Sequence, residues 1–97
     1  MPALLSIVIP TLNSAETINH TLLSLSEGIT SGLIKELIIS DGNSKDDIEK
    51  LSAEIGAVFI KGEKGRGKQL HRGAVQSSAK WIFFIHSDTI LPLGWSQ

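Results

Sequence analysis

Four short apolar runs alternate with three segments of helical periodicity along the 97-residue chain, and this alternation limits the possible folds most strongly. Continuous apolar runs of this length are typical of strands covered on both faces, so we expect strands at 4–9, 36–40, 57–60 and 81–85. Pro10 is expected to end the first of them. Because a helical segment separates each pair of strands, the sequence predicts an α/β fold. We expect a Rossmann-like parallel sheet of about four strands with helices on both faces.

Caps and apolar spacings predict where the helices lie. Asn13 followed by Glu16 makes a capping-box pattern for the first helix, and Ser44 is a suitable N-cap for the second. The third helix is expected over about 66–78. The residues predicted to face the core are Ile18, Leu22, Leu25 and Ile29 in the first helix, Ile48, Leu51 and Ile55 in the second, and Leu70, Ala74 and Val75 in the third.

Composition excludes several classes of protein. Apolar residues make up 41% of the chain and charged residues 20%, which is too apolar for a disordered segment. The net charge of -1 gives no overall attraction to nucleic acid, and the absence of cysteine excludes disulfides and thiolate sites. No apolar run approaches the roughly 20 residues of a membrane span. With no pattern of a signal peptide, the expected location is cytoplasmic.

Polar segments follow all four predicted strands, at 10–13, 41–43, 63–67 and 86–88. In an open parallel sheet, ligands bind outside the carboxyl ends of the strands, so these segments should meet at one edge. Asp41 suits a ribose hydroxyl or a base N–H, and the lysine and arginine of the third segment suit a diphosphate. A carboxylate after the fourth strand suits a divalent metal that bridges the diphosphate. Together the segments predict a nucleoside-diphosphate site.

Each segment also has an ordinary structural explanation. Asp41-Gly42 is a common turn pair, the basic stretch 61–72 could be a solvated face, and His86 could simply end a strand. His20 and His71 fall within predicted helices and are expected to be structural. No Gly-x-Gly-x-x-Gly follows the first strand, and no Gly-x-x-x-x-Gly-Lys-Ser/Thr occurs, so neither a dinucleotide-binding dehydrogenase nor a P-loop is expected.

Four longer segments carry a resemblance to a known family. They are Ser-Ile-Val-Ile-Pro-Thr-Leu-Asn at 6–13, Glu-Leu-Ile-Ile-Ser-Asp-Gly-Asn-Ser-Lys-Asp at 36–46, Gly-Arg-Gly-Lys-Gln-Leu-His-Arg-Gly-Ala at 65–74, and Trp-Ile-Phe-Phe-Ile-His-Ser-Asp-Thr-Ile-Leu-Pro at 81–92. In order and spacing they resemble the nucleotide-binding half of family 2 glycosyltransferases, which have the GT-A fold. The resemblance implies metal-assisted transfer of a sugar from a nucleoside diphosphate, with a UDP-sugar favoured, to an acceptor with inversion.

The resemblance also implies roles for individual residues. Asp88 matches the last aspartate of the family's metal motif and would bind Mn²⁺ or Mg²⁺. His86 stands in place of the first aspartate; imidazole suits Mn²⁺ better than Mg²⁺, and contact with the metal, with the ribose or with neither stays open. The residues implied to bind the nucleotide are Pro10, Thr11, Asn13, Glu16, Asp41, Gly42 and Arg66.

The resemblance places the general base after the metal motif, and no residue from 89 to 97 is acidic. We therefore expect the base beyond Gln97, and expect residues 1–97 to be the nucleotide-sugar-binding portion of a GT-A domain truncated at its C-terminal end. Surface left uncovered by a missing half would favour a homo-oligomer. A longer protein could also be membrane-associated.

Three other interpretations stay open from the sequence. A nucleotidyltransferase-like domain shares the sheet but would want a glycine-rich loop after the first strand. A small α/β interaction domain would have no affinity for nucleotides. A non-catalytic fragment that only binds a nucleotide lies between these possibilities.

Overall fold

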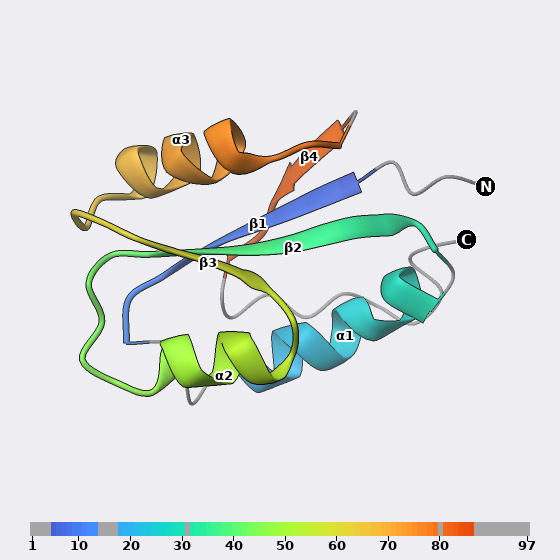
Figure 1. The fold of residues 1–97 in the computed structure, drawn as a ribbon, viewed down its shortest axis with the longest axis horizontal. Helices are drawn as coiled ribbons and strands as arrows, with labels where there is room; N and C mark the ends of the chain where they lie inside the picture. The colour runs from blue at the N-terminus through green and yellow to red at the C-terminus, as the bar shows by residue number, and fades with distance from the viewer. Residues whose placement is uncertain (1–4, 14–17, 31, 80, 87–97) are drawn as a thin grey trace.

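The computed structural model describes residues 5–13, 18–30, 32–79 and 81–86. Strands and helices alternate strictly along the chain (Figure 1). They are β1 (Leu5–Thr11), α1 (Ile18–Thr30), β2 (Ile34–Asp41), α2 (Ile48–Glu54), β3 (Val58–Lys61), α3 (Arg66–Gln76) and β4 (Trp81–Phe84). All the strands pair in parallel, and their order across the sheet is β3-β2-β1-β4. The predicted α/β fold with a parallel sheet is confirmed.

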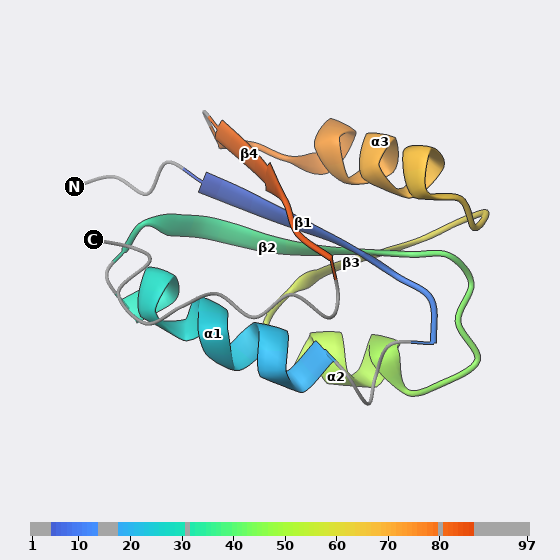
Figure 2. The same cartoon turned by 180° about the vertical axis from the view of Figure 1, so that it is seen from behind.

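The helices cover both faces of the sheet, as predicted. α1 and α2 lie together on one face, and α3 lies alone on the other, where it packs on β1 and β2 (Figures 1 and 2). The chain runs outward from β1 to β2 and β3, and then returns across the sheet to place β4 on the other side of β1. The strand order therefore reverses at β1, and a reversal of this kind opens a crevice at the carboxyl ends of the strands.

The core is centred on the two inner strands. Ile7, Ile9, Ile38 and Ile39 are fully buried, as continuous β-branched runs in a doubly covered parallel sheet should be. From the helices on one face, the buried apolar residues are Ile18, Leu25 and Ile48. On the other face α3 buries Gln69 and Gly73 instead of large apolar side chains.

A close approach of helix and strand explains why a glycine lies on the buried face of α3. A Cβ atom placed on Gly73 would lie 2.3 Å from Cγ1 of Val8. The backbone of α3 therefore rests directly on β1, and the first turn of this helix is fixed in place above the carboxyl end of the sheet.

The prediction that Pro10 ends the first strand is wrong, because β1 continues to Thr11. The amide of Leu5 and the carbonyl of Thr11 bond toward β2, whereas the carbonyl of Val8 accepts from Ile85 on the β4 side. Successive residues of β1 direct their backbone groups alternately toward β2 and toward β4, so the nitrogen of Pro10 faces the β4 side. Pairing with β4 ends at Val8, two residues before Pro10. A proline is tolerated there since no ladder hydrogen bond is lost.

Two predicted helix caps are also wrong. Asn13 has a left-handed φ of 51°, whereas an N-cap residue is usually extended, and α1 is described from Ile18. The N-cap position of α2 is occupied by Asp47, one turn after Ser44. Both Asn13 and Ser44 are used in contacts between loops at the carboxyl edge of the sheet. Glu16, the partner of Asn13 in the expected capping box, lies outside the described residues.

Three residues predicted to face the core are exposed instead: Ile29, Ile55 and Val75. Ile55 follows the end of α2, and Ile29 lies in the last turn of α1. Val75 comes two residues after the buried Gly73, about 200° further around the helix, so it points away from the sheet. No helix in the described ranges is both long and apolar enough to cross a membrane.

Candidate functional site

A pocket of about 400 Å³ opens at the carboxyl ends of β1 and β4, where the strand order reverses. It is formed by the end of β1, the loop that leads into α3, the first turns of α3 and the residue after Ile85. The lining residues are Pro10, Thr11, Leu12, Lys64, Gly65, Arg66, Gln69 and His86. None of these lining residues is acidic, and two carry a full positive charge.

A second, adjoining pocket of about 500 Å³ lies toward the loop after β2. Its lining residues are Leu12, Asn13, Gly42, Asn43, Lys45, Glu63 and Lys64. Leu12 and Lys64 line both pockets, so the two form one continuous polar edge along the sheet.

Asp41 lies beneath this edge and is 1% exposed. Its Oδ1 accepts hydrogen bonds from the hydroxyls of Thr11, at 2.7 Å, and Ser44. Its Oδ2 accepts from the backbone amide of Ser44 at 2.6 Å. The carboxylate is thus occupied by its own chain and joins the ends of β1 and β2. Because the side chain is almost fully buried, a direct contact with a base would require the residues around it to move.

The loop after β2 is tied to the end of β1 from both sides. The amide of Asn13 donates to the hydroxyl of Ser44 at 2.7 Å, and the side-chain oxygen of Asn13 accepts from the amide of Lys45 at 2.9 Å. Asn13 and Asn43 both have left-handed backbones, which asparagine tolerates better than most residues. These contacts explain the local conformation without any ligand.

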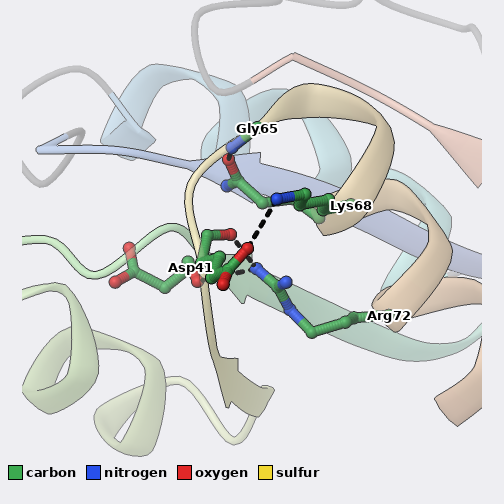
Figure 3. A network of polar contacts seen from close by, with 6 residues as sticks. Asp41, Gly65, Lys68 and Arg72 are labelled. Atoms are coloured by element: carbon green, nitrogen blue, oxygen red, sulfur yellow. Dashed lines mark hydrogen bonds and ion pairs between the residues drawn. The ribbon is translucent and has the colours of Figure 1, made fainter.

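Two cations of the basic stretch, Lys68 and Arg72, are held by contacts within the chain (Figure 3). Lys68 forms an exposed ion pair with Glu63. Arg72 reaches under the loop and donates to the carbonyl of Glu63 at 2.6 Å and to that of Asp41 at 3.4 Å. Within the described part of the chain Lys64 has no ion pair, and Arg66 has a histidine as its partner. Of the basic residues in this stretch, Lys64 and Arg66 are the two that line the first pocket, where they can reach a ligand.

Arg66 and His86 meet across the first pocket, with Nη2 of Arg66 3.2 Å from Nδ1 of His86. A guanidinium only donates, so in this contact Nδ1 is the acceptor and the proton of the neutral ring is on Nε2. In this arrangement neither ring nitrogen offers a free lone pair to a cation. The described residues contain no group of three or more His, Cys, Asp or Glu side chains placed to hold a metal ion.

The structure brings most of the predicted site residues to one edge. Pro10, Thr11, Arg66 and His86 line the first pocket. Asn13 and Gly42 line the second, while Asp41 supports both from below. Glu16 and Asp88 lie outside the described residues, and their predicted roles stay predictions.

Sequence reasoning missed two residues, Gln69 and Arg72. Gln69 is 5% exposed and ties the first turn of α3 to the ends of β1 and β2. A signal was available for Gln69, since a polar residue four positions before the tightly packed Gly73 lies on the same face of the helix. Arg72 gave no such signal, because its role depends on the path of the loop after β3.

The family model described as Glycosyl transferase family 2 matches residues 6–97. The chain belongs to glycosyl transferase family 2. This confirms the resemblance seen in its strand ends and turns. The match covers every described strand and helix except the first residue of β1.

Curated relatives are also similar over most of the chain. The glucosyl-3-phosphoglycerate synthase of Mycobacterium tuberculosis (strain ATCC 25618 / H37Rv) is 34% identical over an alignment of length 97, which covers 91% of this chain and 30% of that protein. The synthase of the same name from Mycolicibacterium paratuberculosis (strain ATCC BAA-968 / K-10) is 32% identical, over 91% of this chain and 29% of that protein. The chain therefore spans a little under a third of the length of these relatives.

Solved structures give the same result for the fold. Glucosyl-3-phosphoglycerate synthase from M. tuberculosis in complex with Mn²⁺, UDP and phosphoglyceric acid has a TM-score of 0.77 and 32% identity. The same values are found for the M. tuberculosis synthase in complex with Mn²⁺ and UDP-glucose. Each comparison covers 91% of this chain and 34% of the other. The predicted relation to GT-A glycosyltransferases is confirmed.

Proposed function

We propose that this chain forms the donor-binding part of an inverting glycosyltransferase, and that it binds a UDP-sugar at the carboxyl edge of its sheet with a divalent cation. The observation that carries the proposal is the pocket at the strand reversal, which is lined by Lys64 and Arg66 and by no carboxylate. A diphosphate is the part of the donor that such a pocket fits best.

Charge and hydrogen-bonding capacity support this assignment. Arginine and lysine bind phosphate oxygens through charge-assisted hydrogen bonds, which are about twice as strong as neutral ones. The first turn of α3 adds backbone amides that no side chain caps, and this turn contains no acidic residue. A helix start of this kind favours an anion placed beside it. The nucleoside would then occupy the adjoining polar pocket near Asn13 and Gly42.

The relatives support the choice of donor. Solved structures of the M. tuberculosis synthase contain UDP or UDP-glucose, and this chain is 32% identical to them across nearly all of its length. The shared region is the sheet whose edge carries the pocket. Since the chain covers about a third of those proteins, the proposal is limited to the donor and leaves the acceptor unassigned.

The divalent cation is supported by the Mn²⁺ in those complexes and by the resemblance at Asp88. When bound, such a cation would supply charge stabilisation for the departing diphosphate. The described residues do not make a metal site by themselves, and His86 is held by Arg66. We therefore assign the carboxylate ligand to Asp88 and expect His86 to contact the metal only if its bond to Arg66 is broken.

Calorimetric titration with UDP, with and without Mn²⁺, tests the proposal. We expect Arg66→Ala and Lys64→Ala each to weaken binding about tenfold, because each removes one charge-assisted contact with phosphate. Lys50→Ala is the matched control, since Lys50 is an exposed lysine of α2 on the other side of the sheet. A folded sample that binds no UDP, or equal affinity in all variants, would contradict the proposal.

A further inference from the structure

We propose that Gln69 is a positioning residue of the donor site, holding together the three chain segments that form the pocket. This inference rests on the proposed function, because it concerns how the same pocket is kept ready for a ligand. No role for Gln69 was predicted from the sequence, and its side chain, though almost fully buried, forms part of the pocket lining.

One amide group makes all the contacts. Nε2 of Gln69 donates to the carbonyl of Thr11 at 2.8 Å and to the carbonyl of Ser40 at 2.9 Å. Oε1 accepts from the backbone amide of Gly65 at 3.1 Å. The end of β1, the end of β2 and the loop before α3 are therefore joined through a single side chain.

The backbone of the same residue adds a fourth connection. The hydroxyl of Ser40 donates to the carbonyl of Gln69 at 2.6 Å, within the buried interior. The carbonyl of Thr11 also accepts from the amide of Gly42 at 2.8 Å, so both of its lone pairs are used. The polar groups at this junction are satisfied by one another and do not depend on solvent.

The chemistry of the junction requires a side chain that donates twice and accepts once. A glutamate would place an oxygen against two backbone carbonyls, and an apolar side chain would remove one donor from each of them. Asparagine is one methylene shorter and would not span the same three segments. Glutamine is therefore the residue type that fits the contacts.

Gly42 gains an explanation from the same contacts. A Cβ atom on Gly42 would lie 2.8 Å from Oε1 of Gln69 and 3.0 Å from Cα of Lys64. The missing side chain makes room for the amide of Gln69 and for the loop that carries Lys64. The predicted role of Gly42 in nucleotide binding can thus be indirect, through clearance for Gln69.

The functional consequence follows from the position of Gly65 between Lys64 and Arg66, the two cations of the pocket. The amide of Gly65 donates to the buried side chain of Gln69, and the flanking Lys64 and Arg66 both line the pocket. Without this bond the loop could change conformation, and the two cations would no longer be held at one fixed separation. A diphosphate needs both cations at once, so the cost should appear in its affinity.

The test uses Gln69→Met, which keeps the length and much of the volume of the side chain but removes its hydrogen bonds. Ile34→Ala is the control, because it destabilises the sheet at the amino end of β2, far along the strand from the pocket. UDP affinity is measured by calorimetry at a temperature where both variants are folded, and hydrogen exchange of the Gly65 amide is measured in the same samples.

We expect Gln69→Met to weaken UDP binding at least about tenfold, since misplaced cations lose most of their charge-assisted bonds. Exchange of the Gly65 amide should accelerate in this variant while exchange of the buried Ile39 amide stays slow. Ile34→Ala should lower the unfolding temperature and leave the UDP affinity unchanged. If Gln69→Met does not fold, Gly42→Ala displaces the same amide and should give the same loss of affinity.

The outcomes separate this inference from the proposed function. If the wild-type chain binds UDP and Gln69→Met (or Gly42→Ala) binds it equally well, the positioning role is refuted and the donor site stands. If the wild-type chain is folded and binds no UDP, the donor site and the role of Gln69 within it are both refuted. An equal loss of affinity in Ile34→Ala would show that general destabilisation, and not Gln69, causes the effect.

Discussion

Replacing Gly73 with alanine tests the close packing of α3 on β1. The new Cβ would lie 2.3 Å from Cγ1 and 3.1 Å from Cγ2 of Val8, which is fully buried. Carbon atoms in contact are ordinarily about 3.5–4.0 Å apart, so α3 would have to move away from the sheet by roughly 1 Å. Gly67→Ala is the matched control, because Gly67 is in the same helix and a Cβ there would meet nothing within 4 Å.

The two variants carry the same substitution in the same helix but differ in the clash. Glycine to alanine inside a helix stabilises by about 1 kcal/mol, with less gain near the helix start. Overpacking a core contact costs about 1–3 kcal/mol. We therefore expect Gly67→Ala to be neutral or slightly stabilising, and Gly73→Ala to be less stable than Gly67→Ala by about 1–3 kcal/mol.

Urea unfolding followed by circular dichroism measures this difference. For a chain of this size 1 kcal/mol corresponds to about 4–8 °C in Tm, so thermal unfolding gives a second reading. Adding Val8→Ala removes both Cγ atoms and leaves Cβ as the nearest contact at 3.3 Å. Part of the loss should then be recovered, as a favourable coupling in the double-mutant cycle. Equal stability of Gly73→Ala and Gly67→Ala would refute the packing described for α3.

Two further variants test the polar contacts at opposite ends of the sheet. Asp41→Asn should destabilise the fold by about 1.5–3 kcal/mol in the same urea assay, since a buried carboxylate with three donors is lost. Asp47→Asn is the control and should have little effect, because the side chain of Asp47 makes no cap hydrogen bond to α2. At the amino end, burial raises the pKa of Glu36, but hydrogen bonds from Ser6 and Ser78 and the charge of Lys35 outweigh it and hold the pKa below its ordinary value of 4.5. A carboxylate whose pKa is lowered on folding stabilises the fold above about pH 4.5, and this stabilisation is lost as the pH falls through the folded-state pKa. The free energy of unfolding, measured from pH 7 to pH 3, should therefore fall less steeply in Glu36→Gln than in wild type. Equal slopes would contradict this role of Glu36.

The layout of the fold could be predicted from the sequence because it depends on local patterns. Each of the four predicted apolar runs overlaps an observed strand. The polar segments that follow the strands could be assigned to one edge for the same reason. The expectation that all four strands are covered on both faces is wrong for β3 and β4, which lie at the edges of the sheet and are half-buried or exposed. The end of β1 was missed, since the tolerance for Pro10 depends on which neighbour its nitrogen faces.

The internal contacts of the site could not be predicted, because they depend on the tertiary path of the loops. Asp41 was expected to face a ligand, and the structure shows its carboxylate bonded to Thr11 and Ser44. The basic stretch was read as one unit, whereas Arg72 turns inward and Lys64 stays available. Gln69 was overlooked since helical periodicity favours apolar residues on a buried face, and this helix buries an amide instead.

Mapping the UDP contacts by NMR tests the central claim most directly. Amide chemical shifts of the isotopically labelled chain are compared before and after addition of UDP and Mn²⁺, with Mg²⁺ as a diamagnetic substitute for assignment. The account predicts the largest changes at the carboxyl edge, in Leu12, Gly42, Gly65 and Arg66, and little change near Glu36 at the opposite end of the sheet. Shifts concentrated at the amino end, or none at saturating UDP in a folded sample, would contradict it.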